Sequence, residues 1–453
     1  MIGGGYVGLV SGACFAAFGV EVRLVEADHG KLAALREGRI PIYEPGLDDL
    51  VSENVAAGRL QFGDDIEAAI DGAEAVFIAV GTPSRRGDGH ADLSYVYAVA
   101  EQIARVARDY IVIVTKSTVP VGTGRRIAEI VQGLRPDLEF DVASNPEFLR
   151  EGNAIGDFMR PDRVVIGTES ERAREVLRTL YRPLYLIETP IVFTGIETAE
   201  LTKYAANAFL AMKISFINEI ATLCENIGGD VHDVARGIGL DRRIGAKFLH
   251  PGPGFGGSCF PKDTLALARI AQDANAPLRL VETVVAVNNA RKAGMGARIV
   301  AGCGGSVRGR TVAVLGLTFK PDTDDMRDAP SLPVVWHLAG DGAKLRLFDP
   351  AGMEQARSLM PDDVAWCRDA LDAASGADVL IVLTEWKEFR ALDPAVLKAR
   401  MAGTIVFDLR NIFDPVAMRE AGFRYFSVGR PNPPPAEPPA ASERSAAVDP
   451  VVA

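Results

Sequence analysis

The chain has 453 residues, of which 48% are hydrophobic and 24% charged, and its formal net charge is −11. This length exceeds one ordinary domain and predicts two or three domains with ample core. The composition is that of a soluble globular protein, and the acidic balance argues against a general nucleic-acid binder. An anionic ligand must therefore be met by a local group of Lys and Arg.

The sequence carries no pattern typical of membrane insertion, disulfides or metal binding. No apolar run approaches the ~18 residues of a membrane-spanning helix, and no basic region precedes the apolar N-terminal stretch. The five cysteines are scattered without a C-x-x-C pair, and the five histidines show no metal-ligand spacing. We therefore expect a cytoplasmic protein without disulfides, membrane contact or a bound metal.

The chain opens on MIGGGYVGLVSG, in which Gly3, Gly5 and Gly8 fit the G-x-G-x-x-G turn that binds dinucleotide pyrophosphates. Such a turn follows a β-strand, yet only Met1 and Ile2 precede it. We expect Met1 to be an internal methionine of a longer native strand. If translation begins here, we expect weaker NAD+ binding and lower stability.

Strand and helix patterns alternate over residues 1–195. Apolar runs typical of buried strands lie at 20–28, 73–83, 110–120 and 162–168. Residues 93–109 have helical spacing, and the alternation predicts a doubly wound, mostly parallel sheet. Glu26 ends the first run, where an acid accepts hydrogen bonds from the adenosine ribose and repels a 2′-phosphate, which favours NAD over NADP.

The pattern becomes helical over 196–300. Residues 197–228 carry no strong helix breaker before Gly228 and predict a helix of roughly thirty residues, against an average of about 11–12. A glycine-rich loop follows at 251–258, and helical spacing then resumes. We expect a central all-helical domain whose long helix connects the other domains and offers a dimer surface.

Alternation of strands and helices returns over 301–430. Its apolar runs repeat the order of the first set, at 310–320, 343–352, 377–386 and 403–411. The predicted fold class is α/β, with two Rossmann-like doubly wound parallel-sheet domains flanking the helical one. The second of these lacks the three-glycine fingerprint and is expected to bind a different nucleotide ligand. The Pro- and Ala-rich stretch 431–453 predicts a disordered tail.

The stretch HPGPGFGGSCFPKDT at 250–264 carries the strongest chemical signal. Cys259 follows glycines, which let a backbone approach a ligand closely and expose a side chain. A cation at Lys262 would lower the pKa of the thiol, and Asp263 is spaced to act as a base or to orient a water. The other four cysteines fit structural positions.

Two pairs of polar residues spaced i, i+4 lie outside that loop. Lys203 and Asn207 share one face of the long helix among apolar neighbours, so this lysine needs an anionic partner or an oxyanion to stabilise. Glu147 and Glu151 have the same spacing in SNPEFLREG and share a face if that stretch is helical.

Taken together, the chain resembles the UDP-glucose 6-dehydrogenases, a branch of the nucleotide-sugar dehydrogenases. The resemblance extends from residue 1 to about residue 430, and its motifs occur in family order: GGGYVGLVSG, IPIYEPGLDDL, KSTVPVGTG, SNPEFLREG, ELTKYAANAFLAMKISFINE, PGPGFGGSCFPKD and GLTFKPDTDDMRDAP. It implies a four-electron oxidation of UDP-glucose to UDP-glucuronate with two NAD+. Cys259 would attack the aldehyde formed at C6, Lys203 and Asn207 would stabilise oxyanions, and water would hydrolyse the resulting thioester.

The resemblance also implies further site residues. Asp263 would assist through an ordered water, Glu147 would be the general base for hydrolysis, and Thr118 would help to hold that water and the nicotinamide region. The matching cofactor contacts are Gly3, Gly5, Tyr6, Val7, Gly8, Glu26, Lys31, Thr82, Thr118, Glu151, Lys262 and Arg327. The matching contacts to UDP-glucose are Phe148, Leu149, Arg150, Glu151, Lys203, Asn207, Arg243, Phe248, Leu249, His250, Pro251, Gly252, Gly256 and Lys320. Arg243 matches an arginine that in some members reaches the sugar nucleotide of a neighbouring subunit, in keeping with a homodimer.

Alternatives to this reading remain. The loop GGSCFPKD resembles the UDP-glucose branch most, with GDP-mannose and UDP-N-acetylhexosamine 6-dehydrogenases as alternatives. An ordinary two-electron dehydrogenase would leave Cys259 incidental and would yield one NADH per sugar rather than two. An alternative of another class is a cofactor-deficient binding or regulatory protein, because so little strand precedes Gly3.

Overall fold

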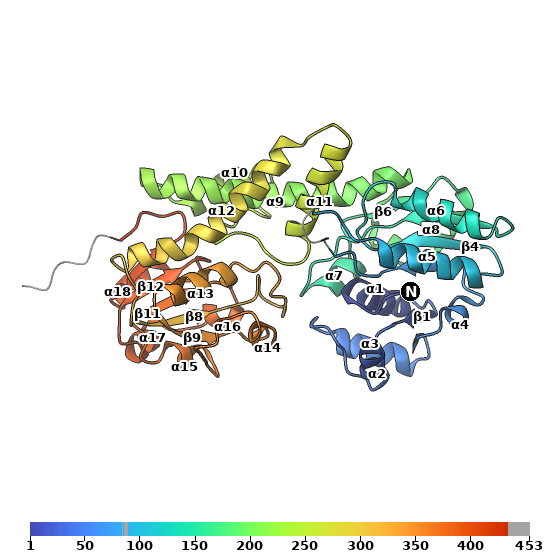
Figure 1. Ribbon diagram of the computed structural model, residues 1–453. Helices are drawn as coiled ribbons and strands as arrows, with labels where there is room; N and C mark the ends of the chain where they lie inside the picture. The colour runs from blue at the N-terminus through green and yellow to red at the C-terminus, as the bar shows by residue number, and fades with distance from the viewer. Residues whose placement is uncertain (84, 86–88, 434–453) are drawn as a thin grey trace, which may run out of the picture.

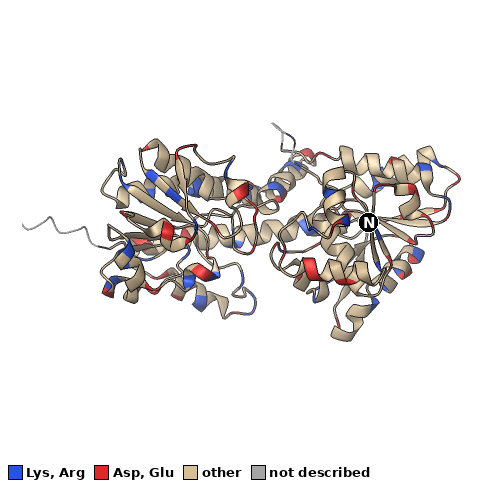
Figure 2. Cartoon of the chain, turned by 90° about the horizontal axis from the view of Figure 1, so that it is seen from below, with Lys and Arg blue, Asp and Glu red and all other residues tan. Residues whose placement is uncertain are grey.

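The computed structural model describes residues 1–83, 85 and 89–433. Figure 1 shows two α/β lobes joined along one edge by helix α9 (Ile196–Ile227), with α12 (Arg279–Gly302) returning toward the C-terminal lobe. Most of the disordered tail predicted over 431–453 lies outside the described residues. Lys and Arg are interspersed with Asp and Glu over both lobes (Figure 2), so a diphosphate has to be bound by individually placed cations.

The N-terminal lobe contains two sheets that together resemble a dinucleotide-binding fold. Its strands are β1 (Val22–Val25), β2 (Leu60–Gly63), β3 (Ala75–Ile78), β4 (Ile111–Thr115), β5 (Phe140–Ser144), β6 (Val164–Gly167) and β7 (Ile191–Thr194). One sheet has the order β3-β4-β5-β6-β7 and the other pairs β1 with β2. All pairs are parallel except β5 with β6, which meet antiparallel.

Ile2 joins these two sheets. It forms parallel bridges to Val25 and to Ile78, its N–H donates to Phe77 O, and Ala79 N–H donates to Ile2 O, both at 2.8 Å. Ile2 is also buried in the apolar core beside β3. The lobe therefore has the spatial order β2-β1-Ile2-β3-β4-β5, in which the short stretch before the glycine turn fills the position of a central strand.

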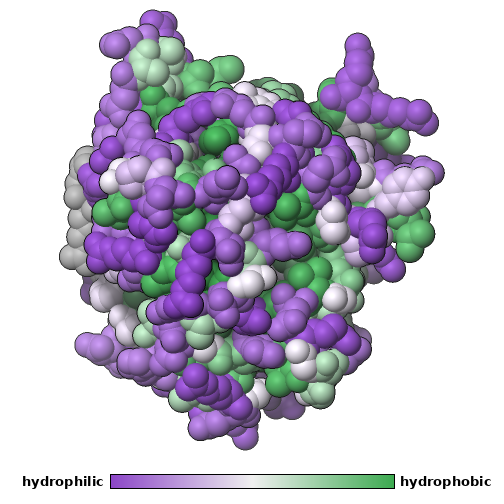
Figure 3. Space-filling view, turned by 90° about the vertical axis from the view of Figure 1, so that its right-hand side faces the viewer, coloured by the Kyte–Doolittle hydropathy of each residue, from purple (hydrophilic) through white to green (hydrophobic). Residues whose placement is uncertain are grey.

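Helices cover the faces of this sheet and bury its apolar side chains. They are α1 (Tyr6–Ala17), α2 (His29–Arg36), α3 (Leu47–Ala56), α4 (Ile66–Ile70), α5 (Ser94–Val106), α6 (Thr123–Leu134), α7 (Ala154–Met159), α8 (Glu171–Leu180) and the 3₁₀ helix η1 (Arg182–Ile187). Leu9 and Phe15 of α1 are buried, and each such side chain contributes about 1.5–3 kcal/mol. The face of this lobe drawn in Figure 3 is mostly hydrophilic, as expected where the apolar helix faces turn inward.

The central region is helical, as the sequence predicted. It consists of α9, α10 (Val231–Gly239), α11 (Phe260–Asp273) and α12. The 32-residue helix α9 ends at Gly228, whose φ of 85° is the left-handed conformation that glycine adopts without strain. Because α9 runs from one lobe to the other, its first half lies near the N-terminal sheet and its second half near the C-terminal lobe.

The C-terminal lobe contains one parallel sheet with the strand order β10-β9-β8-β11-β12-β13. Its strands are β8 (Thr311–Leu315), β9 (Lys344–Phe348), β10 (Val364–Trp366), β11 (Val379–Val382), β12 (Ile405–Asp408) and β13 (Arg424–Ser427). Its helices are α13 (Ser331–Gly340), α14 (Met353–Ala356), α15 (Ala370–Ala374), α16 (Lys387–Arg390), α17 (Pro394–Arg400) and α18 (Pro415–Glu420). In chain order this sheet reads 3-2-1-4-5-6, the order of a doubly wound nucleotide-binding fold.

Candidate active site

The three glycines of the N-terminal turn have distinct geometric roles. Gly3 has a φ of 107°, and a Cβ there would lie 2.6 Å from Ala79 O. A Cβ on Gly8 would lie 1.9 Å from Gly3 O, whereas a Cβ on Gly5 would meet nothing within 4 Å. The first glycine thus makes the turn, the third lets α1 pack closely, and the second faces open space. This is the arrangement that lets a pyrophosphate approach the N-terminus of a helix.

Glu26 lies beside this turn at the end of β1. Its carboxylate is buried and accepts hydrogen bonds from Gly4 N–H at 2.9 Å and Asp28 N–H at 2.8 Å. The same carboxylate lines a cavity of about 780 Å³ together with Ile2 and Gly3. The residues of this edge therefore fit an adenosine dinucleotide, with an acid fixed at the end of β1 beside the glycine turn.

Other expected cofactor contacts follow the next strands. Thr82 Oγ1 donates to Thr118 O at 2.9 Å, which brings together the loops after β3 and β4. The carboxyl ends of parallel strands are where open α/β sheets bind ligands. Lys31 is exposed on α2, with its backbone N–H donating to the capping Asp28.

Cys259 is the N-cap of α11, at the end of the glycine loop. This loop packs against the segment after β8: a Cβ on Gly256 would lie 2.4 Å from Asp328 O, and Gly257, with a φ of 85°, donates its N–H to Arg327 O at 2.7 Å. Only glycine allows so close a contact. Cys259 is partly exposed, while the other four cysteines are buried, as expected for structural positions.

The predicted effect of Lys262 on this thiol is wrong. Burial raises the pKa of Cys259, Lys203 opposes that shift, and the charges of Glu147 and Asp263 add to it. Lys262 Nζ is instead paired with Asp263 Oδ1 at 2.8 Å. The cation that favours the thiolate is therefore Lys203, from a different helix.

Lys203 has the anionic partner that its burial requires. Its Nζ donates to Glu147 Oε1 at 2.9 Å, and both side chains are buried. Burial lowers the pKa of Lys203, but the negative charges of Glu147, Cys259 and Asp263 outweigh it, so the net pKa is raised. The lysine therefore stays an ammonium beside the thiol.

Asn207 lies one turn further along α9 and donates from Nδ2 to Asp263 Oδ2 at 2.6 Å. Together with the Lys203–Glu147 pair, this contact brings side chains from α9, α11 and the segment after β5 into one group around Cys259.

Glu147 and Glu151 do not share a helical face, which corrects the conditional prediction for that stretch. Residues 145–150 form no helix, and Glu147 Oε2 accepts the N–H of Leu149. Glu151 instead accepts from Ser258 Oγ at 2.8 Å and from Thr323 Oγ1 at 3.2 Å, and lies 3.6 Å from Arg327 Nη2. Glu151 thus links the N-terminal lobe, the cysteine loop and the C-terminal lobe.

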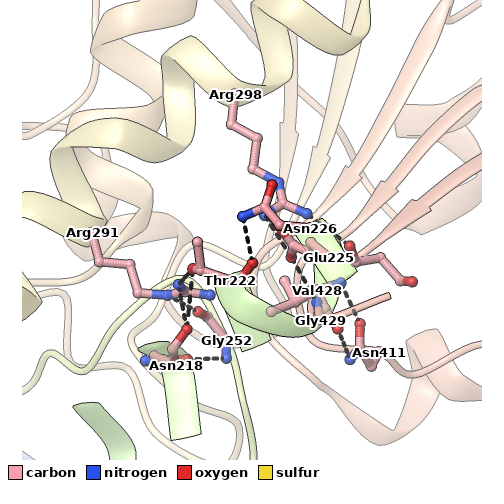
Figure 4. Close-up of polar contacts among 11 residues, drawn as sticks. Asn218, Thr222, Glu225, Asn226, Gly252, Arg291, Arg298, Asn411, Val428 and Gly429 are labelled. Atoms are coloured by element: carbon pink, nitrogen blue, oxygen red, sulfur yellow. Dashed lines mark hydrogen bonds and ion pairs between the residues drawn. The ribbon is translucent and has the colours of Figure 1, made fainter. Parts of the chain in front are cut away.

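The expected substrate loop, residues 248–252, is hydrogen-bonded to residues of α9 and α12. Gly252 N–H donates to Asn218 Oδ1 at 2.8 Å, and Arg291 Nε donates to Gly252 O at 2.6 Å (Figure 4). Arg410 lies against the same glycine, because a Cβ there would be 3.2 Å from its Nη1. Phe248, at the start of the loop, has a φ of 66°, a strained value for a bulky residue.

One cavity of about 720 Å³ brings many of the expected residues together. Its lining includes Glu147, Phe148, Leu149, Arg150, Lys203, Asn207, Phe248 and Cys259. Leu249, His250, Pro251, Gly252, Gly256 and Lys320 lie outside this lining, on the neighbouring loops. Burial lowers the pKa of Lys320, while Glu151 and Cys259 oppose that shift. Arg243 is separate: its side chain is 89% exposed and paired with Asp241.

The sequence did not identify several polar residues at this site. Four such residues line the same cavity: Lys116, Asn145, Tyr181 and Arg163. The guanidinium of Arg163 stacks 3.6 Å from the centre of the Phe148 ring.

Within the described ranges, no group of three or more His, Cys, Asp or Glu is placed to hold a metal ion. None of the helices described is long and apolar enough to cross a membrane.

Comparison with known proteins agrees with this geometry. Three models of the UDP-glucose/GDP-mannose dehydrogenase family match the chain: the NAD binding domain over residues 1–185, the central domain over 197–290 and the UDP binding domain over 313–415. A UDP-glucose 6-dehydrogenase of Rhizobium meliloti (strain 1021) is 60% identical over 434 residues, which cover 95% of this chain and 99% of that protein.

A solved structure agrees as well. A UDP-glucose dehydrogenase from the hyperthermophilic archaeon Pyrobaculum islandicum superposes with a TM-score of 0.87 at 39% identity and covers 95% of this chain and 96% of that one. The structure of a UDP-D-ManNAc dehydrogenase from Pyrococcus horikoshii superposes with a TM-score of 0.80 at 25% identity. The match covers 95% of this chain and 98% of that one. The chain belongs to the UDP-glucose/GDP-mannose dehydrogenase family.

Proposed function

We propose that this NAD-dependent oxidoreductase converts UDP-glucose to UDP-glucuronate through a thioester on Cys259. One UDP-glucose, two NAD+ and one water give one UDP-glucuronate, two NADH and three protons. NAD+ supplies the hydride acceptor in both oxidations. The observation that carries the proposal is that Cys259, Lys203, Asn207 and Glu147 line one cavity.

In the first oxidation C6 loses a hydride, and the hydroxyl proton passes to solvent through the water that Asp263 orders. Lys203 and Asn207 stabilise the negative charge that develops on the C6 oxygen as the alcohol becomes an aldehyde. Asp263, bonded to Asn207 at 2.6 Å, takes the thiol proton of Cys259 through a water. The thiolate then forms a carbon–sulfur bond to C6 as the C=O π bond breaks, and the aldehyde oxygen takes up the proton that left Cys259 to become a thiohemiacetal hydroxyl. In the second oxidation C6 loses another hydride, the hydroxyl proton passes to solvent, and a thioester results.

Glu147 completes the cycle as the general base. It takes a proton from the attacking water, the carbon–sulfur bond breaks, and the thiolate and the carboxylate product result. The pair that Glu147 forms with Lys203 at 2.9 Å holds its carboxyl group at a buried position in this cavity, which supports this role. Thr118, joined to Thr82, helps to hold the water and the nicotinamide region.

UDP-glucose is the favoured substrate. The Rhizobium meliloti and Pyrobaculum islandicum proteins described above are named for that sugar nucleotide, and the first is the more similar in sequence. The UDP half would meet Lys320, the Phe248–Gly252 loop and Gly256, with Arg410 beside Gly252 as an additional cation. The alternative substrates are GDP-mannose and a UDP-N-acetylhexosamine, the class of sugar nucleotide for which the Pyrococcus horikoshii protein is named.

Trapping the thioester tests this mechanism. Purified Glu147→Gln protein, mixed with UDP-glucose and NAD+, should release two NADH per active site and then stall. Intact-protein mass spectrometry should find the mass of the UDP-glucuronyl group on Cys259. Cys259→Ser is the matched control and should show neither the adduct nor acid formation. Full UDP-glucuronate production by Cys259→Ser would refute the nucleophile role.

We also propose that the protein is a cytoplasmic homodimer joined through α9. Phe209, Phe216, Leu223 and Ile227 follow one another at helical spacing and are each at least half exposed. An apolar stripe of this kind on a central helix is typical of a buried interface. In such a dimer, the exposed Arg243 would be free to reach the partner's site. Phe216→Asp should shift the molar mass in multi-angle light scattering from dimer to monomer; an unchanged mass would exclude this face.

A further inference from the structure

Lys116 is a buried cation in the active-site cavity to which the proposed reaction gives no role. It follows strand β4, is 4% exposed, and lines the cavity with Glu147, Lys203 and Cys259. Its Nζ donates to Asn145 Oδ1 at 3.0 Å and to Tyr181 Oη at 3.1 Å. Among the described residues it forms no ion pair with a carboxylate, so its positive charge is not neutralised by direct contact.

Keeping a charge in this place is costly. The rings of Phe158 and Tyr181 lie 5.7 and 5.8 Å from the ammonium, and the side chain is almost completely withdrawn from solvent. Burial lowers the pKa of Lys116 to about 8, and the negative charge of Glu147 opposes that shift. A group with such a perturbed environment inside a catalytic cavity is a candidate for function.

The charges of the proposed reaction require a second cation. Glu147 is 6% exposed and has one paired cation, Lys203, at 2.9 Å. In the proposed mechanism Lys203 also stabilises the oxyanion at C6. When it does so, two negative charges share one ammonium in a buried site, which is unfavourable. Lys116 lines the same cavity and supplies a second positive charge, so that two cations balance two anions.

The contacts of Asn145 connect Lys116 to the position of Glu147. Asn145 lies two residues before Glu147, and its Oδ1 accepts from both Lys116 and Tyr181, the latter at 2.6 Å. Its Nδ2 donates to Val165 O at 2.9 Å and its N–H to Thr115 O at 2.9 Å. The segment that carries Glu147 is thus fixed by a buried polar group whose cation is Lys116.

We propose that Lys116 is a positioning residue that holds the Glu147 segment and compensates the Glu147 charge while Lys203 stabilises the substrate oxyanion. This inference rests on the proposed function. It assigns Lys116 no direct contact with substrate and no transfer of a proton to it.

Lys116→Met is the decisive variant. Methionine has a similar length and fits an aromatic shell, and removing an unpaired buried charge is neutral or stabilising for the fold. We expect an unchanged or higher Tm, a KM for UDP-glucose within about threefold of wild type, and a kcat at pH 7 lower by about tenfold or more. A purely structural lysine would instead lower the Tm and leave the kcat of the folded fraction unchanged.

The pH profile is the second readout. Lys116 carries its charge below pH 8 and loses it above, so the kcat of the wild type should fall as the pH rises through about 8. The other groups that face the ammonium are Glu147, Lys203, Cys14 and Tyr181. The limb near pH 8 should be absent from Lys116→Met. Tyr181→Phe removes one acceptor of the ammonium and should move the limb to lower pH.

Lys292→Met is a matched control, because Lys292 is also a buried lysine, lies outside this cavity and is paired with Asp328 at 2.6 Å. It should keep the limb near pH 8. An unchanged kcat and pH profile in Lys116→Met, or a Tm loss that parallels every kinetic loss, would overturn the inference. The proposed function fails separately, if wild-type protein releases one NADH per UDP-glucose rather than two.

Discussion

The two lobes of this protein have the same strand order but differ in the turn that follows the first strand of each sheet. In the N-terminal lobe the turn after Ile2 is open at Gly5, and the acid Glu26 lies beside a cavity. In the C-terminal lobe the turn after β8 is closed, because the buried carboxylate of Asp349 accepts from Leu317 N–H at 2.7 Å and Thr318 N–H at 3.1 Å. The topology provides a ligand edge in both lobes, but the residues at the turn decide which ligand fits.

This difference assigns separate tasks to the lobes. The open glycine turn suits a dinucleotide, while the C-terminal lobe presents Lys320 and Arg410 toward the cysteine loop instead. Glu151 touches Ser258 and Thr323, so both lobes meet at the loop that carries Cys259. Variants that affect one lobe should therefore change one ligand and spare the other.

The largest effect is expected from Gly8→Ala. The new Cβ would lie 1.9 Å from Gly3 O, so the turn must open or α1 must move. We expect NAD+ affinity to fall by about a hundredfold or more, which is about 2.7 kcal/mol. Isothermal titration calorimetry should find UDP-glucose affinity within about threefold of wild type. Equal losses for both ligands would contradict the division between the lobes.

Asp349→Asn should act on the other lobe. Asp349 Oδ1 also accepts from Ala351 N–H at 2.9 Å and Gly352 N–H at 2.7 Å, and an amide nitrogen cannot replace an acceptor there. The expected loss in the free energy of unfolding of this lobe is about 2–4 kcal/mol. Chemical denaturation followed by the Trp386 fluorescence measures it, since Trp386 donates to the same carboxylate at 3.2 Å. NAD+ affinity should be unchanged, and a variant that loses it would count against the comparison.

Gly5→Ala should give a smaller, purely ligand-dependent effect. The added Cβ meets nothing in the protein within 4 Å, so we expect it to affect only a pyrophosphate bound at this turn. We expect NAD+ binding to weaken by about tenfold with no loss of Tm. Gly340→Ala, at the end of α13 and equally free of contacts, is the matched control and should leave both ligands unaffected.

The smallest effect concerns cofactor choice. Glu26→Gln keeps the size of the side chain but removes the charge that repels a 2′-phosphate. We expect NAD+ affinity to fall by about threefold to tenfold and the preference for NAD+ over NADP+ to narrow, as read from the ratio of kcat/KM values. An undiminished preference would show that Glu26 does not select the cofactor.

The sequence could predict what depends on local pattern. The open glycine turn, the long helix ending at Gly228 and the need of Lys203 for an anion all follow from neighbours in the chain. The half-exposed strands β2 and β7 were missed, because β2 interrupts its apolar residues with Gln61 and the apolar run of β7 is only three residues long. Glu147 and Glu151 do not share a helical face, because contacts with other segments position each side chain.

Long-range pairing explains the remaining misses. Lys262 could not be excluded as the cation beside Cys259 until its pair with Asp263 was visible. Lys116 is the first residue of the KSTVPVGTG motif, directly after a buried strand and at the ligand edge of the sheet, a position that could have been recognised from the sequence. Its partners Asn145 and Tyr181 are 29 and 65 residues away in the chain, so the local sequence could not predict these hydrogen bonds.

The most direct test of a four-electron oxidation shared between the two lobes is the stoichiometry of the wild-type reaction. Purified protein is given a limiting, known amount of UDP-glucose with excess NAD+, and NADH is counted by absorbance while the sugar products are separated by chromatography. Two NADH per UDP-glucose, with UDP-glucuronate as the product, is the expected result. One NADH per UDP-glucose, with an aldehyde as the product, would contradict the role of Cys259 and the mechanism built on it.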